Sequence, residues 1–337
     1  MDSTGQNTVS LPLNVALPGM DFDDAVSAPF RMQPGLRRLA PDAQQLTPLA
    51  PGARHQREKL AVLSCFADQA LLQSTGFDPA PALNALATHA AAEHPQHWAW
   101  RDGVAHAMRL GCAVRADTGE VLHTAAGSFG LGDEVSRCLR GLPPEWRLAG
   151  LLSLAFAEDF AVIDGQAPRR GLIPWLAVAL PSFWAPEDKI GRVFTEVHAP
   201  VADNRLLLQA ADALTAMVTG PERWERYVWT VTPHPRLHAH PARVAPERWG
   251  SGSGSGFDPL AAWWRSERQT FIPVPGAAQA VFTIRIDLQP LPAVLTAAPE
   301  RAARLGAALA SMSPAVLDYR GLTAVRQPLL DWLATQA

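Results

Sequence analysis

The sequence predicts an α+β fold, in which a five-stranded antiparallel sheet carries helices packed on one face. The order of elements is the first observation: two strand-like segments, a helical stretch and three more strand-like segments follow one another between residues 159 and 287. The second is composition, since 48% of the 337 residues are hydrophobic, enough for one large domain or two smaller ones. Such a sheet and its helices leave between them a pocket large enough for a flat cofactor.

The N-terminal part divides into an extended arm and a helical region. Residues 1–55 are rich in proline and glycine, a composition typical of an arm laid over a core. Residues 56–145 are expected to be mainly helical, because apolar side chains recur there at three- and four-residue spacing. The helices expected in this region cover about 57–76, 81–93 and 133–142. One hairpin is expected over 112–125, around Asp117-Thr118-Gly119.

Residues 146–295 form the domain that carries the sheet, and residues 296–337 are expected to form C-terminal helices. The five strands are expected at 159–163, 172–179, 226–231, 269–274 and 281–287. Pro275-Gly276 predicts a hairpin between the last two strands. Helices are expected over 148–154 and 203–218.

The segment 178–201, between the second and third strands, is the most informative part of the chain. Proline and two acids at 186–188 are typical of a first helical turn, and apolar residues then recur at helical spacing up to 197. His198 falls one turn after Phe194, at the end of the expected helix. A lone histidine on an apolar face is more often a hydrogen-bonded core residue, but it could also be an axial ligand of haem iron.

Charge and hydropathy exclude several classes of protein. The formal net charge of −3 and the pI near 6.4 give no basic surface for nucleic acid or for a membrane. The chain has no apolar stretch of transmembrane length, and its first residues lack the features of a signal peptide. We therefore expect a cytoplasmic protein that binds neither nucleic acid nor a membrane.

The cysteines limit the cofactors that the chain can hold. Cys65, Cys112 and Cys138 are widely spaced, which is typical of reduced structural residues. An iron–sulfur cluster needs four closely spaced thiolates, and a covalent c-type haem needs C-x-x-C-H; neither pattern occurs. Any haem would therefore be held without a covalent bond.

A glycine-rich stretch and a group of histidines suggest ligand sites, but neither matches a known binding pattern. Residues 250–256, GSGSGSG, are typical of a flexible linker and do not match the G-x-G-x-x-G fingerprint, so we expect no nicotinamide or flavin module. His234, His238 and His240 have a spacing that could hold zinc, but a solvated loop is favoured because no fourth ligand lies nearby in the sequence.

Four ordered blocks resemble a known family. They are Glu158-Asp159-Phe160, PSFWAPEDKIGRVFTEVHAPV at 181–201, Arg226-Tyr227-Val228-Trp229 and RSERQTFIPVPGAAQAVFTIRIDLQPL at 265–291. In this order they resemble the α subunit of the haem-dependent oxidative N-demethylases, over about residues 150–320. The resemblance implies a PAS-like sheet that holds haem b, and oxidation of a small methylated amine such as dimethylamine by dioxygen.

The resemblance also implies roles for three residues. His198 would be the proximal ligand of the iron, and Arg226 and Glu267 would be the polar pair of the distal pocket. A carboxylate suits the cationic ammonium group of a secondary amine, and an arginine could donate hydrogen bonds to bound dioxygen. The alternatives are that Arg226 and Glu267 pair with one another at a strand edge, or that Arg226 binds a haem propionate.

Other residues near these motifs are expected around the cofactor. Arg268 should point away from Glu267 by strand alternation, and we expect it to be a structural residue or a propionate partner. Lys189 is expected to be solvated or to pair with a propionate, and Trp184 and Trp229 to line the core or the haem edge. Val228 stands where the family has asparagine, a change that could alter the choice of substrate.

Electrons for the implied reaction would come from partners. The resemblance implies reductase subunits that carry FMN, a [2Fe–2S] centre and an NADPH site, and a folate-binding subunit that takes up formaldehyde. Two alternatives stay open at this point. The chain could be a haem-PAS module that senses a gas without catalysis, or a structural subunit that has lost its haem.

Overall fold

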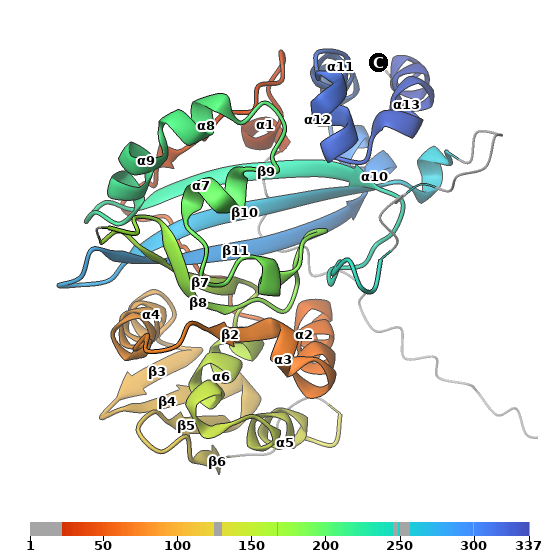
Figure 1. Ribbon diagram of the computed structural model, residues 1–337. Coiled ribbons are helices and arrows are strands. Elements are labelled where there is room, and N and C mark those ends of the chain that lie inside the picture. The colour runs from red at the N-terminus through yellow and green to blue at the C-terminus, as the bar shows by residue number, and fades with distance from the viewer. Residues whose placement is uncertain are drawn as a thin grey trace, which may run out of the picture.

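Two antiparallel sheets organise the chain (Figure 1). The computed structural model describes residues 22–124, 130–166, 168–244, 249, 257–298 and 300–336. The larger sheet has the strand order β1-β9-β10-β11-β7-β8-β2, and the smaller has the order β3-β4-β5-β6. The glycine–serine segment 250–256 lies outside the described residues.

The five expected strands form the continuous centre of the larger sheet. Its members are β1 (Arg37–Arg38), β9 (Trp224–Thr232), β10 (Trp263–Pro273), β11 (Gln279–Pro290), β7 (Asp159–Asp164), β8 (Leu172–Ala177) and β2 (Leu71–Gln73). All of the pairings are antiparallel, as expected. The hairpin of β10 and β11 is confirmed, and it turns at Gly276, whose φ of +76° a residue with a side chain rarely adopts.

The smaller sheet adds strands to the region at 56–145, where the sequence predicted helices and one hairpin. It consists of β3 (Trp98–Arg101), β4 (Val104–Ala107), β5 (Cys112–Arg115) and β6 (Val121–His123). The hairpin of β5 and β6 was expected, whereas β3 and β4 were missed because they are short and rich in alanine. Their turn did carry a signal, since Asp102 and Gly103 both have positive φ (50° and 71°), as a type I′ hairpin turn requires.

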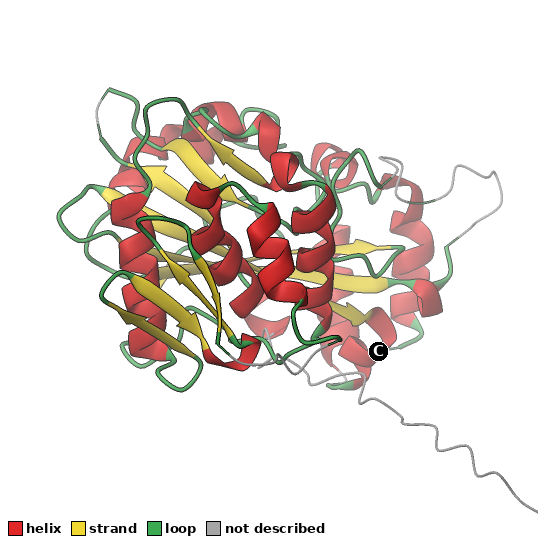
Figure 2. Cartoon of the chain, turned by 90° about the horizontal axis from the view of Figure 1, so that it is seen from below, coloured by secondary structure: helices red, strands yellow, loops and turns green. Residues whose placement is uncertain are grey.

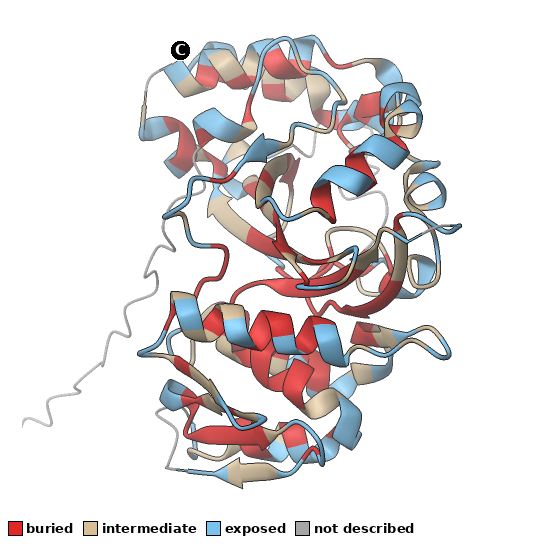
Figure 3. Cartoon of the chain, turned by 90° about the vertical axis from the view of Figure 1, so that its left-hand side faces the viewer, coloured by how far each residue is buried: buried red, intermediate tan, exposed pale blue. Residues whose placement is uncertain are grey.

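Helices cover both faces of the larger sheet, which corrects the expectation of one covered face. The helices of the N-terminal half are α2 (Arg54–Cys65), α3 (Ala67–Ala70), α4 (Ala80–Glu93), α5 (Glu134–Gly141) and α6 (Arg147–Ala155). Helices α2, α4 and α6 contribute to one buried core with Ile272 and Val281 of the sheet. Figure 3 shows buried residues concentrated in the sheet and in these helices, and Figure 2 shows the same layers from below.

The opposite face carries α7 (Phe194–His198), α8 (Arg205–Gln209) and α9 (Ala211–Val218). Val218 of α9 packs with Phe271 and Ala280 of the sheet. The segment at 186–198 is not one helix, as the sequence predicted, but a 3₁₀ turn (Pro186–Asp188) followed by α7. Gly191, with φ of +72°, breaks it, because the chain there bonds to Ile173 of β8 through backbone groups. The helix expected at 203–218 is likewise divided into α8 and α9.

The C-terminal helices are confirmed. They are α10 (Leu291–Thr296), α11 (Glu300–Ala310), α12 (Pro314–Tyr319) and α13 (Arg326–Ala334), and they share a second core with α1 (Phe22–Ala25) of the N-terminal arm. Trp229 and Trp264 belong to this core. The division of the chain into four domains stays a prediction.

Candidate functional site

His198 is the last residue of α7, and its ring is oriented by its own helical turn. Nδ1 lies 2.8 Å from the backbone oxygen of Phe194, and the two rings stack with centroids 4.0 Å apart. Because a carbonyl oxygen can only accept, Nδ1 carries the hydrogen. The other nitrogen, Nε2, therefore presents a lone pair, which is the arrangement that a metal-binding histidine needs.

The surroundings of His198 keep its ring neutral. The pKa of His198 is lowered to about 4, mainly by burial and also by the positive charges of Arg226 and Lys189, while the hydrogen bond to Phe194 opposes them. At neutral pH the imidazole is uncharged and free to bind a metal through Nε2. The positive charge of Arg226, on strand β9, is one of the causes of this lowered pKa.

Arg226 and Glu267 point to the same face of the larger sheet. In the register of β9 and β10, Arg226 lies opposite Gln269, and Glu267 lies opposite Val228. Opposite residues of an antiparallel pair share a face, so these four side chains are neighbours. Gln269 Nε2 donates to Glu267 Oε2 at 2.7 Å, which confirms the expected alternation. Glu267 is only 9% exposed.

Arg226 has unused hydrogen-bonding capacity. Its Nε is buried and has no hydrogen-bond partner among the described residues. Burial lowers the pKa of Arg226, while the carboxylate of Glu267 and then the phenolate form of Tyr319 raise it. A buried N–H without a partner is costly in a folded protein and is typical of a site that a ligand completes.

Lys189 and Trp184 lie on the same side of the sheet as His198. Trp184 and Ile190 pack against a small cluster of Ala161, Leu176 and Val178. Burial lowers the pKa of Lys189, partly opposed by Asp188. Lys189 also acts electrostatically on His198. By register Arg226 and Glu267 share one sheet face, Trp184 packs against other side chains of that face, and Arg226 and Lys189 both act electrostatically on His198.

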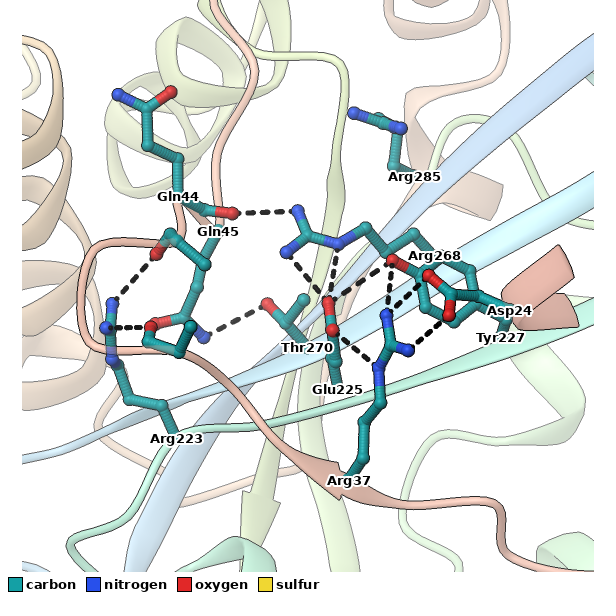
Figure 4. A network of polar contacts seen from close by, with 12 residues as sticks. Asp24, Arg37, Gln44, Gln45, Arg223, Glu225, Tyr227, Arg268, Thr270 and Arg285 are labelled. Carbon is teal, nitrogen blue, oxygen red and sulfur yellow. Dashed lines mark hydrogen bonds and ion pairs between the residues drawn. The ribbon is translucent and has the colours of Figure 1, made fainter. Parts of the chain in front are cut away.

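Arg268 and Trp229 lie on the opposite face, which favours the structural alternative over the cofactor contact for each residue. Arg268 Nε lies 2.9 Å from Glu225 Oε2, and its NH1 donates to the backbone oxygen of Gln44 at 2.8 Å (Figure 4). Trp229 is 3% exposed, and its ring stacks on that of Trp264 with centroids 5.0 Å apart. Both residues are structural: Arg268 ties β9 and β10 to the N-terminal arm, and Trp229 fills the second core.

Sequence reasoning did not foresee two neighbours of the site. Gln269 holds the carboxylate of Glu267, and the signal for this was its position two residues further along the same strand. Tyr319, from the C-terminal helix α12, acts electrostatically on Arg226. No pattern in the sequence connects residues so far apart.

A surface pocket of about 480 Å³ lies on the other side of α7, between the β7–β8 loop and α9. Phe194 lines it, but neither His198 nor Glu267 does. We place the candidate site at the sheet face instead, because Arg226 and Glu267 share that face by register and the buried Nε of Arg226 has no hydrogen-bond partner among the described residues.

Within the described residues, no group of three or more His, Cys, Asp or Glu side chains could hold a metal ion. This includes the loop with the zinc-like spacing, where His238 Nδ1 bonds to the backbone of Ala179 and His240 Nε2 faces Glu187 at 3.2 Å. Single ligation by His198 therefore suits a metal that a macrocycle already holds.

In the part of the chain that the structure describes, no helix is both long and apolar enough to cross a membrane.

Comparison with known families gives a match to the family described as haem-dependent oxidative N-demethylase, alpha subunit-like, over residues 135–330. The matched span is more than half of the chain, and it includes all seven residues expected at the site. This chain belongs to the haem-dependent oxidative N-demethylase, alpha subunit-like family.

Proposed function

We propose that this protein is a haem-dependent monooxygenase that removes a methyl group from a small methylated amine, such as dimethylamine, and releases formaldehyde. One observation carries the proposal: the neutral imidazole of His198, with Nε2 free, stands over the sheet face that holds Glu267 and Arg226. The family is described as haem-dependent and alpha subunit-like, which supports both a haem cofactor and a multi-subunit complex.

The residues present fit a non-covalently bound haem b. His198 would bind the iron through Nε2, and Trp184 and Ile190 supply apolar surface for the ring on the same face. Lys189 is a cation near His198 that could pair with a propionate. When bound, haem supplies the redox-active iron that activates dioxygen.

Glu267 provides the anchor for the substrate. A methylated amine is a cation at neutral pH, and a nearly buried carboxylate attracts it strongly. Gln269 fixes Oε2 of that carboxylate, which leaves Oε1 to accept an N–H of the substrate. This contact would hold the amine on the sheet face that Glu267 shares with Arg226, whose buried Nε–H has no partner among the described residues and could donate to an acceptor there.

The overall reaction fixes what partners must supply. One oxygen atom of dioxygen ends in formaldehyde and the other in water, so each demethylation consumes two electrons and two protons. We propose, as the resemblance to the family implies, that reductase subunits with FMN, a [2Fe–2S] centre and an NADPH site provide the electrons. A folate-binding subunit would take up the formaldehyde.

The test loads the purified chain with haem, adds a reductase and measures formaldehyde from dimethylamine. We expect amine-dependent formaldehyde release, and a shift of the visible spectrum when dimethylamine binds the ferric protein. His198→Ala should lose the spectrum of axially ligated haem. Glu267→Gln should keep that spectrum but lose the response to amine. Failure of every methylamine in a panel to shift the spectrum or to drive formaldehyde release would refute the proposal.

The burial of Glu267 bears on the gas-sensing alternative. A sensor of a neutral diatomic gas has no use for a carboxylate in its pocket, so exposure of Glu267 to solvent would have favoured that reading. Glu267 is instead 9% exposed and held by Gln269. This supports a site for a cationic substrate.

A further inference from the structure

The carboxylate of Glu267 lies between two apolar side chains. In the sheet register, Val228 of β9 is directly opposite Glu267 on one side, and Ile286 of β11 is directly opposite it on the other. Opposite residues in antiparallel strands have Cβ atoms roughly 5 Å apart, so both side chains are direct neighbours of Glu267. Ile286 is 1% exposed, whereas Val228 is half-buried.

The polar partners of Glu267 are few. Among the described residues its one hydrogen bond comes from Gln269, whose donor end, Nε2, is turned toward the carboxylate. The acceptors available to a bound cation beside Glu267 are thus the carboxylate oxygens themselves. An N–H that points toward Val228 or Ile286 meets no acceptor, and an unpaired buried donor weakens binding.

We propose that Val228 selects substrates by the number of methyl groups on their nitrogen. Ammonium ions with fewer methyl groups, and therefore more N–H groups, would bind more weakly. The inference rests on the proposed function. Trimethylammonium has one N–H, which Oε1 of Glu267 can accept, and dimethylammonium has two, which the lone pairs that Gln269 leaves on the carboxylate can accept. Methylammonium has three, and its third N–H points toward the apolar side chains of Val228 and Ile286. In the more methylated ions a methyl group takes that position and packs against them. A site of this kind discriminates by leaving polar groups unpaired as well as by filling space.

Amine binding to the haem-loaded ferric protein tests this without turnover. Methylammonium, dimethylammonium and trimethylammonium are titrated at one pH and ionic strength, and affinities come from the visible spectrum and from calorimetry. We expect wild type to bind the di- and trimethylated ions roughly tenfold or more tighter than methylammonium, the range of one apolar contact or one unpaired donor.

Three substitutions at Val228 separate shape from hydrogen bonding. Val228→Thr has nearly the same shape, and Val228→Asn is larger, but each adds an acceptor beside Glu267. Each should reduce the preference for trimethylammonium over methylammonium by roughly three- to tenfold. Val228→Ala removes the wall without adding an acceptor, so it should weaken trimethylammonium without strengthening methylammonium.

Two outcomes would overturn the inference. If amines still shift the spectrum but the preference stays within twofold of wild type in both Val228→Thr and Val228→Asn, Val228 does not select and the demethylase proposal stands. If no amine binds the wild-type protein, both proposals fall. Far-UV circular dichroism and haem uptake of each variant show that the comparison is made between folded proteins.

Discussion

Acidification should destabilise the fold through His198. Burial lowers the pKa of this ring from 6.5 to about 4, so the folded protein resists protonation there while the unfolded chain does not. Between these two values the unfolded state binds more protons, and stability rises with pH. The stabilisation is therefore present above about pH 6.5 and is lost as the pH falls through about 4.

The size of this effect follows from the shift. Each pKa unit corresponds to about 1.4 kcal/mol, so a shift from 6.5 to about 4 gives at most about 3 kcal/mol. Partial access of water to the ring reduces this value. Other buried histidines, such as His55 and His94, add their own pH dependence, because burial lowers the pKa of each.

The measurement isolates His198 by difference. Free energies of unfolding in urea are determined for the haem-free wild type and for His198→Gln at several pH values from 7.5 to 4. We expect the free energy of unfolding of wild type minus that of the variant to decrease by up to about 3 kcal/mol as the pH falls from 7.5 to 4. His123→Gln, on the exposed end of β6, is the matched control and should follow wild type. Parallel curves for wild type and His198→Gln would show that the site around His198 is open to water and would refute the reasoning.

Three further predictions follow from other contacts. Lys59→Met should lower the free energy of unfolding by about 3 to 5 kcal/mol, because Lys59 and Asp159 form a fully buried ion pair at 3.1 Å. A urea titration measures this loss. The double variant Lys59→Met/Asp159→Asn should recover part of it, because no buried charge is then left unpaired. Glu267→Gln should weaken dimethylammonium binding at least tenfold and leave the affinity for haem unchanged, as spectral titrations with each ligand would show. If the variant and the wild type bind dimethylammonium equally well, Glu267 is not part of the site. Arg268→Leu should destabilise the protein by about 1 to 3 kcal/mol, since it removes a partner of the nearly buried Glu225, yet leave haem uptake unaltered; loss of haem would restore a cofactor role to Arg268.

The central sheet was predictable because its strands are long and their apolar residues alternate or run continuously. The edge strands β1 and β2 were not, since pairs of two or three residues are stabilised by neighbours far away in the sequence. Helical periodicity at 186–198 was outweighed by backbone bonds between Gly191 and Ile173, which end the first turn early. Local patterns therefore identified the main elements but not where long-range contacts interrupt them.

The site was predictable where alternation applies. Val228 and Gln269 fall an even number of positions from Arg226 and Glu267, and they share the face of those residues. Trp229 lies three positions from Arg226, so the same rule would have placed it in the core on the other side. The closeness of His198 to β9, and of Tyr319 to Arg226, depends on how α7 and α12 pack, which no local pattern encodes.

The ring of His198 takes its orientation from Phe194, within the same five-residue helix. In the proposed function, the orientation of the iron ligand is therefore set within one short helix, and not by the strands that would contact the substrate. Mutations that change reactivity at the iron and mutations that change selectivity for the amine would then fall in separate segments of the chain.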